Sequence, residues 1–269
     1  MRPWGKFAGA KKFSFIVILL TASGISEARA QSLSTLDLTV SAAISLKDAF
    51  EDIGRVFKEK KPGVKLVFNF GGSGNLARHI EAGAPVDVFA SAAQKDMDDI
   101  EKKGLLSPNS RREFGRNTVV LIQPAHSTVS LGSVRDLPKH EIKRIAVGNP
   151  RTVPAGRYAE EALRHFNLWE ALKEKLVFGE NVRQVLDYVA RNEADAGLVY
   201  STDAAARSKD VRIVEKLPAD SHQPVIYPIG VIKGTKAEPL ARAFVDFVAS
   251  PEGQKILSQY GFLTSYSFK

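Results

Sequence analysis

From Leu36 onward, short runs of β-forming residues alternate with longer helical runs. "LDLTVSAAI" predicts a strand, "SLKDAFEDIGRVFKEKK" an amphipathic helix and "GVKLVFNF" the next strand. The rhythm continues through "NLARHIEAG", "VDVFASA", "QKDMDDIEKKG" and "TVVLIQP". This alternation predicts an α/β fold in which mainly parallel sheets are flanked by helices.

A second series of the same kind follows a loop around residues 124–142. It begins with "RIAVGNP" and ends with the strand "PVIYPIGVI", which would return to the first series, and two further helices. We therefore predict two lobes joined by two crossings of the chain, with a ligand in the cleft at the carboxyl ends of the strands. The chain should cross between the lobes near residues 117–121 and 224–230. Lobe 1 should contain residues 36–118 and 228–269, and lobe 2 residues 119–227.

The first thirty residues predict a cleavable secretory signal peptide. Four basic residues precede an apolar run from Phe13 to Leu20, and Ala28-Arg29-Ala30 forms a small-x-small cleavage site. The apolar run is far shorter than the ~20 residues that span a bilayer. We expect cleavage after Ala30 and a mature protein in the periplasm.

Charge and cysteine content narrow the class of partner. Residues 1–30 hold five basic residues and one acidic residue, so their removal lowers the net charge from +8 to +4. The remaining Lys and Arg form no long basic block, which argues against a nucleic-acid partner. The chain has no cysteine, so it forms no disulfide and carries no thiol for a lipid anchor. We expect a freely diffusing monomer that binds a small ligand.

The glycine-rich run "FNFGGSGNLARHI", residues 68–80, is compatible with two kinds of enzyme site. It contains the spacing of a dinucleotide-binding turn, but Asp87 opens the next strand, where a ribose-binding acid should close it. A nucleophile elbow around Ser73 would need a glycine at the position of Asn75. With Asp203 and His222 as partners, Ser73 would otherwise make the chain a secreted serine hydrolase.

A third interpretation of the run needs no chemical reaction. Glycines let a backbone approach an anion, and the free N–H groups of a helix start donate hydrogen bonds to it together with a serine hydroxyl. Ser45 offers a second hydroxyl of this type, where we expect the N-cap of a helix with Asp48 as the capping acid. Two such junctions indicate one anion site.

These motifs resemble the periplasmic molybdate-binding proteins that deliver their ligand to an ABC importer. The resemblance covers the chain from about Leu36 to Phe262, in the family's order and spacing. It implies a type II periplasmic binding protein fold that encloses molybdate or tungstate, a membrane permease with its ATPase as partner, no cofactor and no catalytic activity. The segments that carry it are "AAISLKDAF", "GSGNLARHIEAGAPVDVFASA", "AVGNPRTVPAGRYAEEAL", "NVRQVLDYVARNEADAGLVYSTDA" and "YPIGVI".

The resemblance also implies the ligand-binding residues. They are two serine hydroxyls, two backbone N–H groups and one tyrosine hydroxyl, from Ser45, Ser73, Ala155, Val182 and Tyr200. Metal would enter the site only inside the oxyanion. The family often has a run rich in serine and threonine where this chain has glycines, and Ser73 keeps the matched position.

Local sequence agrees with this set. Pro154 and Gly156 flank Ala155 at a helix start, and Asn181 can cap the helix that Val182 opens. Arg78 and Lys47 fall on outer helix positions, where we expect solvated side chains and not counter-charges for the anion. The five histidines are scattered, so no cluster predicts a cation site. Another oxyanion such as sulfate stays open as the ligand.

Overall fold

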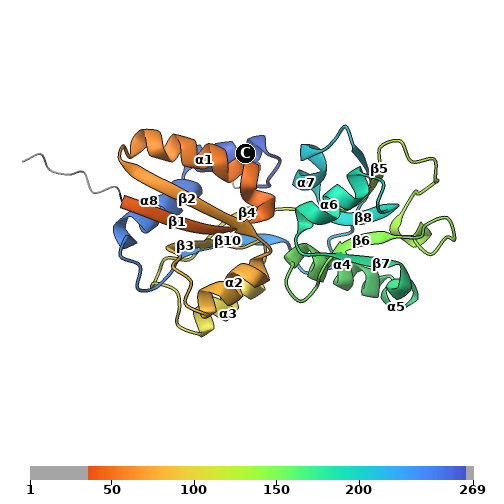
Figure 1. Ribbon diagram of the computed structural model, residues 1–269, viewed down its shortest axis with the longest axis horizontal. Coiled ribbons are helices and arrows are strands. Elements are labelled where there is room, and N and C mark those ends of the chain that lie inside the picture. Colours follow the sequence, from red (N-terminus) through yellow and green to blue (C-terminus); the bar gives the residue numbers. More distant parts are fainter. Residues whose placement is uncertain (1–35, 265–269) are drawn as a thin grey trace, which may run out of the picture. The chain divides into compact units, whose positions relative to one another are not determined.

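The computed structural model describes residues 36–264 and consists of two α/β lobes (Figure 1). The predicted signal peptide lies outside the described residues. The strands of the first lobe are β2 (Val64–Gly71), β1 (Leu36–Ala43), β3 (Val88–Ala90), β10 (Ile226–Val231) and β4 (Arg112–Arg116), in that spatial order. Its helices are the 3-10 turn η1 (Ile44–Leu46), α1 (Lys47–Lys60), α2 (Ser73–Glu81), α3 (Gln94–Lys102), α8 (Glu238–Ala249) and α9 (Pro251–Gln259).

The second lobe has a five-stranded sheet of the same design. Its strands are β7 (Leu176–Gly179), β6 (Ile145–Gly148), β8 (Ala196–Tyr200), β5 (Val119–Pro124) and β9 (Val211–Lys216), in that spatial order. Its helices are η2 (Val134–Asp136), α4 (Pro154–His165), α5 (Trp169–Leu172), η3 (Lys173–Lys175), α6 (Val182–Ala190) and α7 (Ser201–Ala206).

The predicted two-lobed α/β fold is confirmed, but both sheets are mixed. In the first sheet β1 pairs in parallel with β2 and β3, whereas β10 is antiparallel to β3 and β4. In the second sheet β6 is parallel to β7 and β8, whereas β5 is antiparallel to β8 and β9. The reversed strands β5 and β10 are those that enter a lobe directly from the other one, without a crossover helix to turn the chain back.

Strand β4 is absent from the sequence-based prediction. Its sequence "REFGR" is polar at both ends, and only Phe114 and Gly115 are buried. A short edge strand of this kind lacks the apolar alternation that marks a strand. The exact boundaries of the two lobes remain a prediction. The strand that returns to the first sheet, β10, begins at Ile226.

The carboxyl ends of the parallel strands face the junction of the lobes (Figure 1). In lobe 1, β1 leads into η1 and β2 leads into α2; in lobe 2, β6 leads into the loop before α4, β7 into α6 and β8 into α7. Helix starts from both lobes therefore meet at this junction, and the first N–H groups of a helix have no partner within it.

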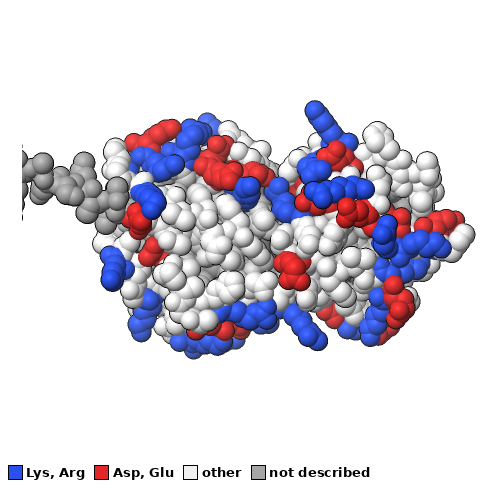
Figure 2. Space-filling model, in the orientation of Figure 1, with Lys and Arg blue, Asp and Glu red and all other residues white. Residues whose placement is uncertain are grey.

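The face of the described residues that Figure 2 shows has no dominant charge. On the face in Figure 2, Lys and Arg alternate with Asp and Glu around the rim, and the middle of lobe 1 is largely uncharged. Among residues 36–264, no helix is both long and apolar enough to cross a membrane.

Candidate functional site

A small cavity lies where the strand ends of both lobes meet. Its empty volume, which includes space open to solvent, is about 190 Å³. None of the residues that line it has a charged side chain. All five residues predicted from the sequence line this cavity: Ser45, Ser73, Ala155, Val182 and Tyr200.

Ser73 is placed to donate a hydrogen bond into the cavity. It is the first residue of α2, is fully buried, and its Oγ accepts the backbone N–H of Ala92 at 3.0 Å. Because the backbone bond uses Ser73 Oγ as an acceptor, the hydroxyl proton stays available for a ligand.

Ser45 reaches the cavity in a different way from the one predicted. It lies inside η1, whose N-cap is Ala43 and has no side-chain cap bond, so the prediction that Ser45 is an N-cap is wrong. Its Oγ lies 3.1 Å from the hydroxyl of Tyr227, which in turn lies 3.4 Å from Nδ2 of Asn117. Since the Asn117 amide nitrogen only donates, Tyr227 can accept from it and donate to Ser45, which leaves the Ser45 proton for a ligand.

Ala155 and Val182 offer backbone N–H groups. Ala155 is the second residue of α4, which begins with Pro154, and Val182 is the first residue of α6. N–H groups at these positions have no partner within their helix. The cap of α6 is the predicted one, because the Asn181 side chain accepts from the Gln184 N–H at 3.0 Å, and this cap leaves the Val182 N–H unused.

Tyr200 is the last residue of β8 and is 1% exposed. Its hydroxyl has no hydrogen-bond partner among the described residues. Buried polar groups nearly always have a partner, so an unpaired hydroxyl on a cavity wall indicates a ligand. Burial raises the pKa of Tyr200 well above its usual value, so the hydroxyl stays protonated and can donate.

The groups of the serine hydrolase alternative are each bound elsewhere. Asp203 Oδ1 accepts from Arg183 Nε at 2.6 Å. His222 is half-buried with its ring against Tyr158, and its Nδ1 lies 2.7 Å from the carbonyl oxygen of Gln223. Among the described residues, no hydrogen bond joins Ser73 to a histidine that could act as its base.

The other charged candidates have structural or solvent contacts. Asp87 accepts the Thr39 backbone N–H at 2.7 Å, which is a structural role and not that of a ribose-binding acid. Arg78 is exposed and bonds Asn75, and Lys47 is exposed, 3.9 Å from Glu51, as predicted. Within residues 36–264, no group of three or more acidic or histidine side chains could hold a metal ion.

The sequence did not indicate why glycines surround Ser73. A Cβ on Gly74 would lie 2.9 Å from the carbonyl oxygen of Thr152 and 3.0 Å from its Cα, in the opposite lobe. A Cβ on Gly72 would lie 3.0 Å from the carbonyl oxygen of Glu180, also in lobe 2. The Gly74 N–H donates to Thr152 O at 3.0 Å. The absence of side chains at these glycines lets the backbone of the other lobe come close. The sequence-based interpretation expected the same absence to let an anion come close.

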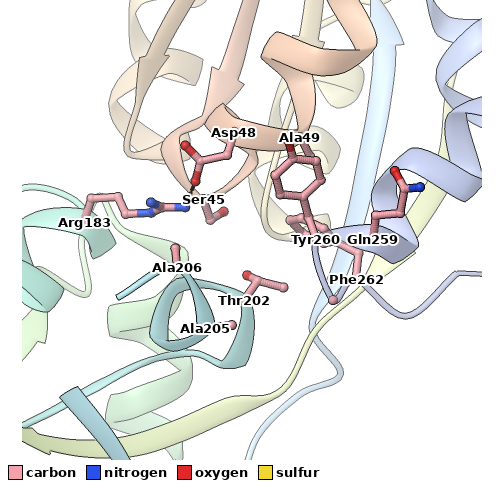
Figure 3. Close-up of a pocket in the computed structure, with 11 residues that line it drawn as sticks. Ser45, Asp48, Ala49, Arg183, Thr202, Ala205, Ala206, Gln259, Tyr260 and Phe262 are labelled. Atoms are coloured by element: carbon pink, nitrogen blue, oxygen red, sulfur yellow. Dashed lines mark hydrogen bonds and ion pairs between the residues drawn. The ribbon is translucent and has the colours of Figure 1, made fainter. Parts of the chain in front are cut away.

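A larger groove opens beside the cavity and shares Ser45 with it (Figure 3). Its empty volume is about 630 Å³. Arg183 reaches from lobe 2 across this groove to Asp48 of lobe 1, as the dashed line in Figure 3 marks. The sequence analysis did not predict this contact. The one signal for it was that Arg183 directly follows Val182, a predicted ligand residue.

Asp203 makes the stability of the protein depend on pH. Complete burial raises its pKa from 3.8 to about 6, although Arg183 opposes the shift and Asp48 adds to it. A folded-state pKa above the unfolded one gives stability that is full below pH ~4 and is lost as the pH rises through about 6. The loss should be roughly 3 kcal/mol, at about 1.4 kcal/mol per pKa unit.

The measurement is denaturant unfolding of the wild-type protein and Asp203→Asn between pH 4 and pH 7. The free energy of unfolding of the wild type should fall relative to that of the variant over this range. A difference between the two proteins that stays constant with pH would contradict the prediction.

Comparisons with known proteins agree with this geometry. The family model for bacterial extracellular solute-binding proteins matches residues 38–263. The molybdate-binding protein ModA of Escherichia coli (strain K12) is 41% identical over 84% of this chain and 88% of its own length. ModA of Haemophilus influenzae is 39% identical over 94% of this chain and 98% of its own.

A solved structure shows the same fold. The periplasmic molybdate-binding protein of Azotobacter vinelandii superposes with a TM-score of 0.75 and 25% identity, over 84% of this chain and 98% of its own. The resemblance predicted from the sequence is thereby confirmed. The chain belongs to the bacterial extracellular solute-binding protein family, in the group that includes the ModA molybdate-binding proteins.

Proposed function

We propose that the protein captures molybdate or tungstate in the periplasm and delivers it to an ABC importer. One observation carries this proposal. Five possible donors from five separate segments line a cavity that has no charged side chain, and one of them, the Tyr200 hydroxyl, is buried without a partner among residues 36–264. The ModA relatives, whose names state that they bind molybdate, support it.

A pocket of neutral donors suits a buried dianion. A buried cation beside it would gain Coulomb energy, but both ions would lose their hydration, so the net benefit is small. Several hydrogen bonds to a charged acceptor, each worth roughly 1.5–3 kcal/mol, distribute the charge without that loss. Ser45, Ser73, Ala155, Val182 and Tyr200 are proposed as these donors.

Such a pocket also selects by protonation and size. A phosphate that keeps a proton would place its own O–H donor against the N–H and O–H donors of the protein, which is unfavourable. Molybdate, tungstate and sulfate carry no proton at neutral pH. The dimensions of the cavity would then separate sulfate from the two larger ions. Sulfate is the second candidate ligand on this chemistry.

Several further features belong to the same proposal. The chain acts as a monomer with no catalytic activity and no cofactor, and residues 1–30 are removed on export. Residues 36–118 with 228–269 and residues 119–227 move as two bodies that close on the ligand, and the closed form docks on the permease.

Isothermal titration calorimetry of the mature protein with molybdate, tungstate, sulfate and phosphate tests the ligand. We expect molybdate and tungstate to bind about 10- to 100-fold more tightly than phosphate, the cost of one mismatched buried hydrogen-bonding group. Tight sulfate binding without molybdate binding would make sulfate the ligand, and absence of any oxyanion binding would refute the proposal. A fluorophosphonate reagent that labelled Ser73 would favour the hydrolase instead.

A further inference from the structure

Two ion pairs cross from one lobe to the other, between helices that lie at opposite edges of the lobe junction in Figure 1. Arg183 Nη2 lies 2.8 Å from Asp48 Oδ2, between α6 and α1, in the upper half of Figure 1. Arg157 Nη2 lies 2.6 Å from Asp96 Oδ2, between α4 and α3, in the lower half. In both pairs the arginine belongs to lobe 2 and the aspartate to lobe 1, so opening of the lobes must break both.

The first pair links two of the proposed donors. Arg183 follows Val182 at the start of α6, and Asp48 lies in the first turn of α1, three residues after Ser45. The pair therefore joins the segment that presents the Val182 N–H to the segment that presents the Ser45 hydroxyl.

The second pair does the same on the other side. Arg157 lies two residues after Ala155 in α4, and Asp96 lies in the first turn of α3. The segment before α3 contains Ala92, whose N–H holds the Ser73 hydroxyl. This pair joins a donor of lobe 2 to the group that orients a donor of lobe 1.

We propose that Arg183 and Arg157 are positioning residues, whose pairs with Asp48 and Asp96 hold the lobes at the separation where donors from both reach one ligand. This inference rests on the proposed oxyanion function, because it concerns the donors of that site. Neither arginine touches the cavity, so each acts through its neighbour and not on the ligand.

The two pairs differ in burial, so they should contribute differently to holding the lobes together. The side chains of Arg157 and Asp96 are 17% and 5% exposed, whereas those of Arg183 and Asp48 are 21% and 39% exposed. Loss of one partner from a buried pair leaves the other charge without compensation, whereas a solvated pair contributes little. The Arg157 pair should therefore dominate.

Arg183 is held in place independently of the other lobe. Its Nε donates to Asp203 Oδ1 at 2.6 Å, within lobe 2, and the Asp203 side chain is fully buried. The guanidinium thus keeps its orientation when the lobes part, and closure need only bring Asp48 to it. A preorganised group loses less conformational entropy on pairing.

The pairing also keeps the site neutral. An unpaired arginine next to a donor would attract any anion, including protonated phosphate. Asp96 balances the charge of Arg157, and Asp203 and Asp48 balance that of Arg183, so neither arginine presents an unpaired positive charge near the ligand. Selection is then left to the donors themselves.

The test uses a variant that removes the pair without changing the net charge, Asp96→Asn with Arg157→Gln. We expect its Kd for molybdate to rise about threefold to tenfold through faster dissociation, with an association rate within about threefold of the wild type, because the closed form loses the bond between the lobes. Asp96→Asn alone leaves the Arg157 charge uncompensated on closure and should raise Kd about 10- to 100-fold. Asp48→Asn, which keeps the Arg183 contact with Asp203, should raise Kd by about threefold.

The matched control is Asp187→Asn with Arg207→Gln. This pair measures 2.9 Å between Asp187 Oδ1 and Arg207 Nη1, against 2.6 Å for the Arg157–Asp96 pair, but both residues belong to lobe 2. We expect an unchanged Kd and dissociation rate. A thermal midpoint within a few degrees of the wild type shows that each variant is folded.

A second readout follows closure without a ligand. The chain has no cysteine, so Val67→Cys in lobe 1 and Ile213→Cys in lobe 2, both about 40% exposed at the native residue, give specific spin-label sites. Pulsed electron spin resonance then measures the distance between the lobes. The population with the short distance should be smaller in the Asp96→Asn, Arg157→Gln background.

The outcomes separate this inference from the proposed function. A wild type that binds molybdate while the charge-neutral double variant binds it equally, or loses only association rate, overturns the inference and leaves the function intact. A wild type that binds no oxyanion refutes the function, and the inference then depends on whether the short-distance population differs between the two backgrounds.

Discussion

Replacing Ser45 and Ser73 together with alanine should abolish measurable molybdate and tungstate binding. Each hydroxyl would lose a charge-assisted hydrogen bond worth roughly 1.5–3 kcal/mol, so the two together should raise Kd about 100- to 10,000-fold. Both side chains are at most 3% exposed, and both line the cavity. Calorimetry with the two ions measures the effect.

The fold should survive this double change. Ser73→Ala leaves the Ala92 N–H without its present acceptor, which costs about 1–3 kcal/mol and lowers the thermal midpoint by several degrees. Ser258→Ala, in α9 and outside the cavity, is the control that should leave binding unchanged. Undiminished affinity in the double variant would show that other groups hold the ligand.

Gly74→Ala should weaken binding while preserving or raising the stability of the ligand-free protein. The new Cβ would stand 2.9 Å from Thr152 O in the opposite lobe, closer than carbon and oxygen normally approach. Overpacking of this kind costs about 1–3 kcal/mol, so Kd should rise about 5- to 150-fold. In the open form the same residue lies in the first turn of a helix, where alanine is favoured over glycine by up to about 1 kcal/mol, the value for a helix interior.

Opposite changes in affinity and stability distinguish this effect from simple unfolding. Gly74→Val should raise Kd further, because its γ-carbons would meet the same backbone. Gly115→Ala is the control, since a Cβ there meets no atom closer than 3.8 Å. Equal affinity of Gly74→Ala and wild type would mean that the lobes do not approach this closely when they bind.

The predictable part of this protein is the part that local sequence determines. The starts of α4 and α6 follow from Pro154 and Asn181, which act within three residues of their own position. The two lobes follow from the order of strand and helix patterns along the chain. The five proposed donors were implied by the resemblance to the molybdate-binding proteins, and local sequence agrees because each lies at the end of a strand or near the start of a helix.

Contacts between distant residues were beyond the sequence. Ser45 was expected to cap α1, but its hydroxyl bonds Tyr227, which lies 182 residues away and enters through β10. Arg183 pairs with Asp48 across 135 residues. No local pattern encodes such a partner, and glycine next to Ser73 is equally compatible with an approaching anion and an approaching backbone.

The central place of β10 has a consequence for how the chain folds after export. Every strand of the second sheet comes from residues 119–216, so that sheet is complete as soon as this segment has been released. The first sheet has β10 between β3 and β4 and must wait for residues 226–231, although its other strands emerge earlier. We therefore expect lobe 2, from the middle of the chain, to fold before lobe 1 is complete. Until β10 is available, β3 and β4 cannot be joined in one sheet.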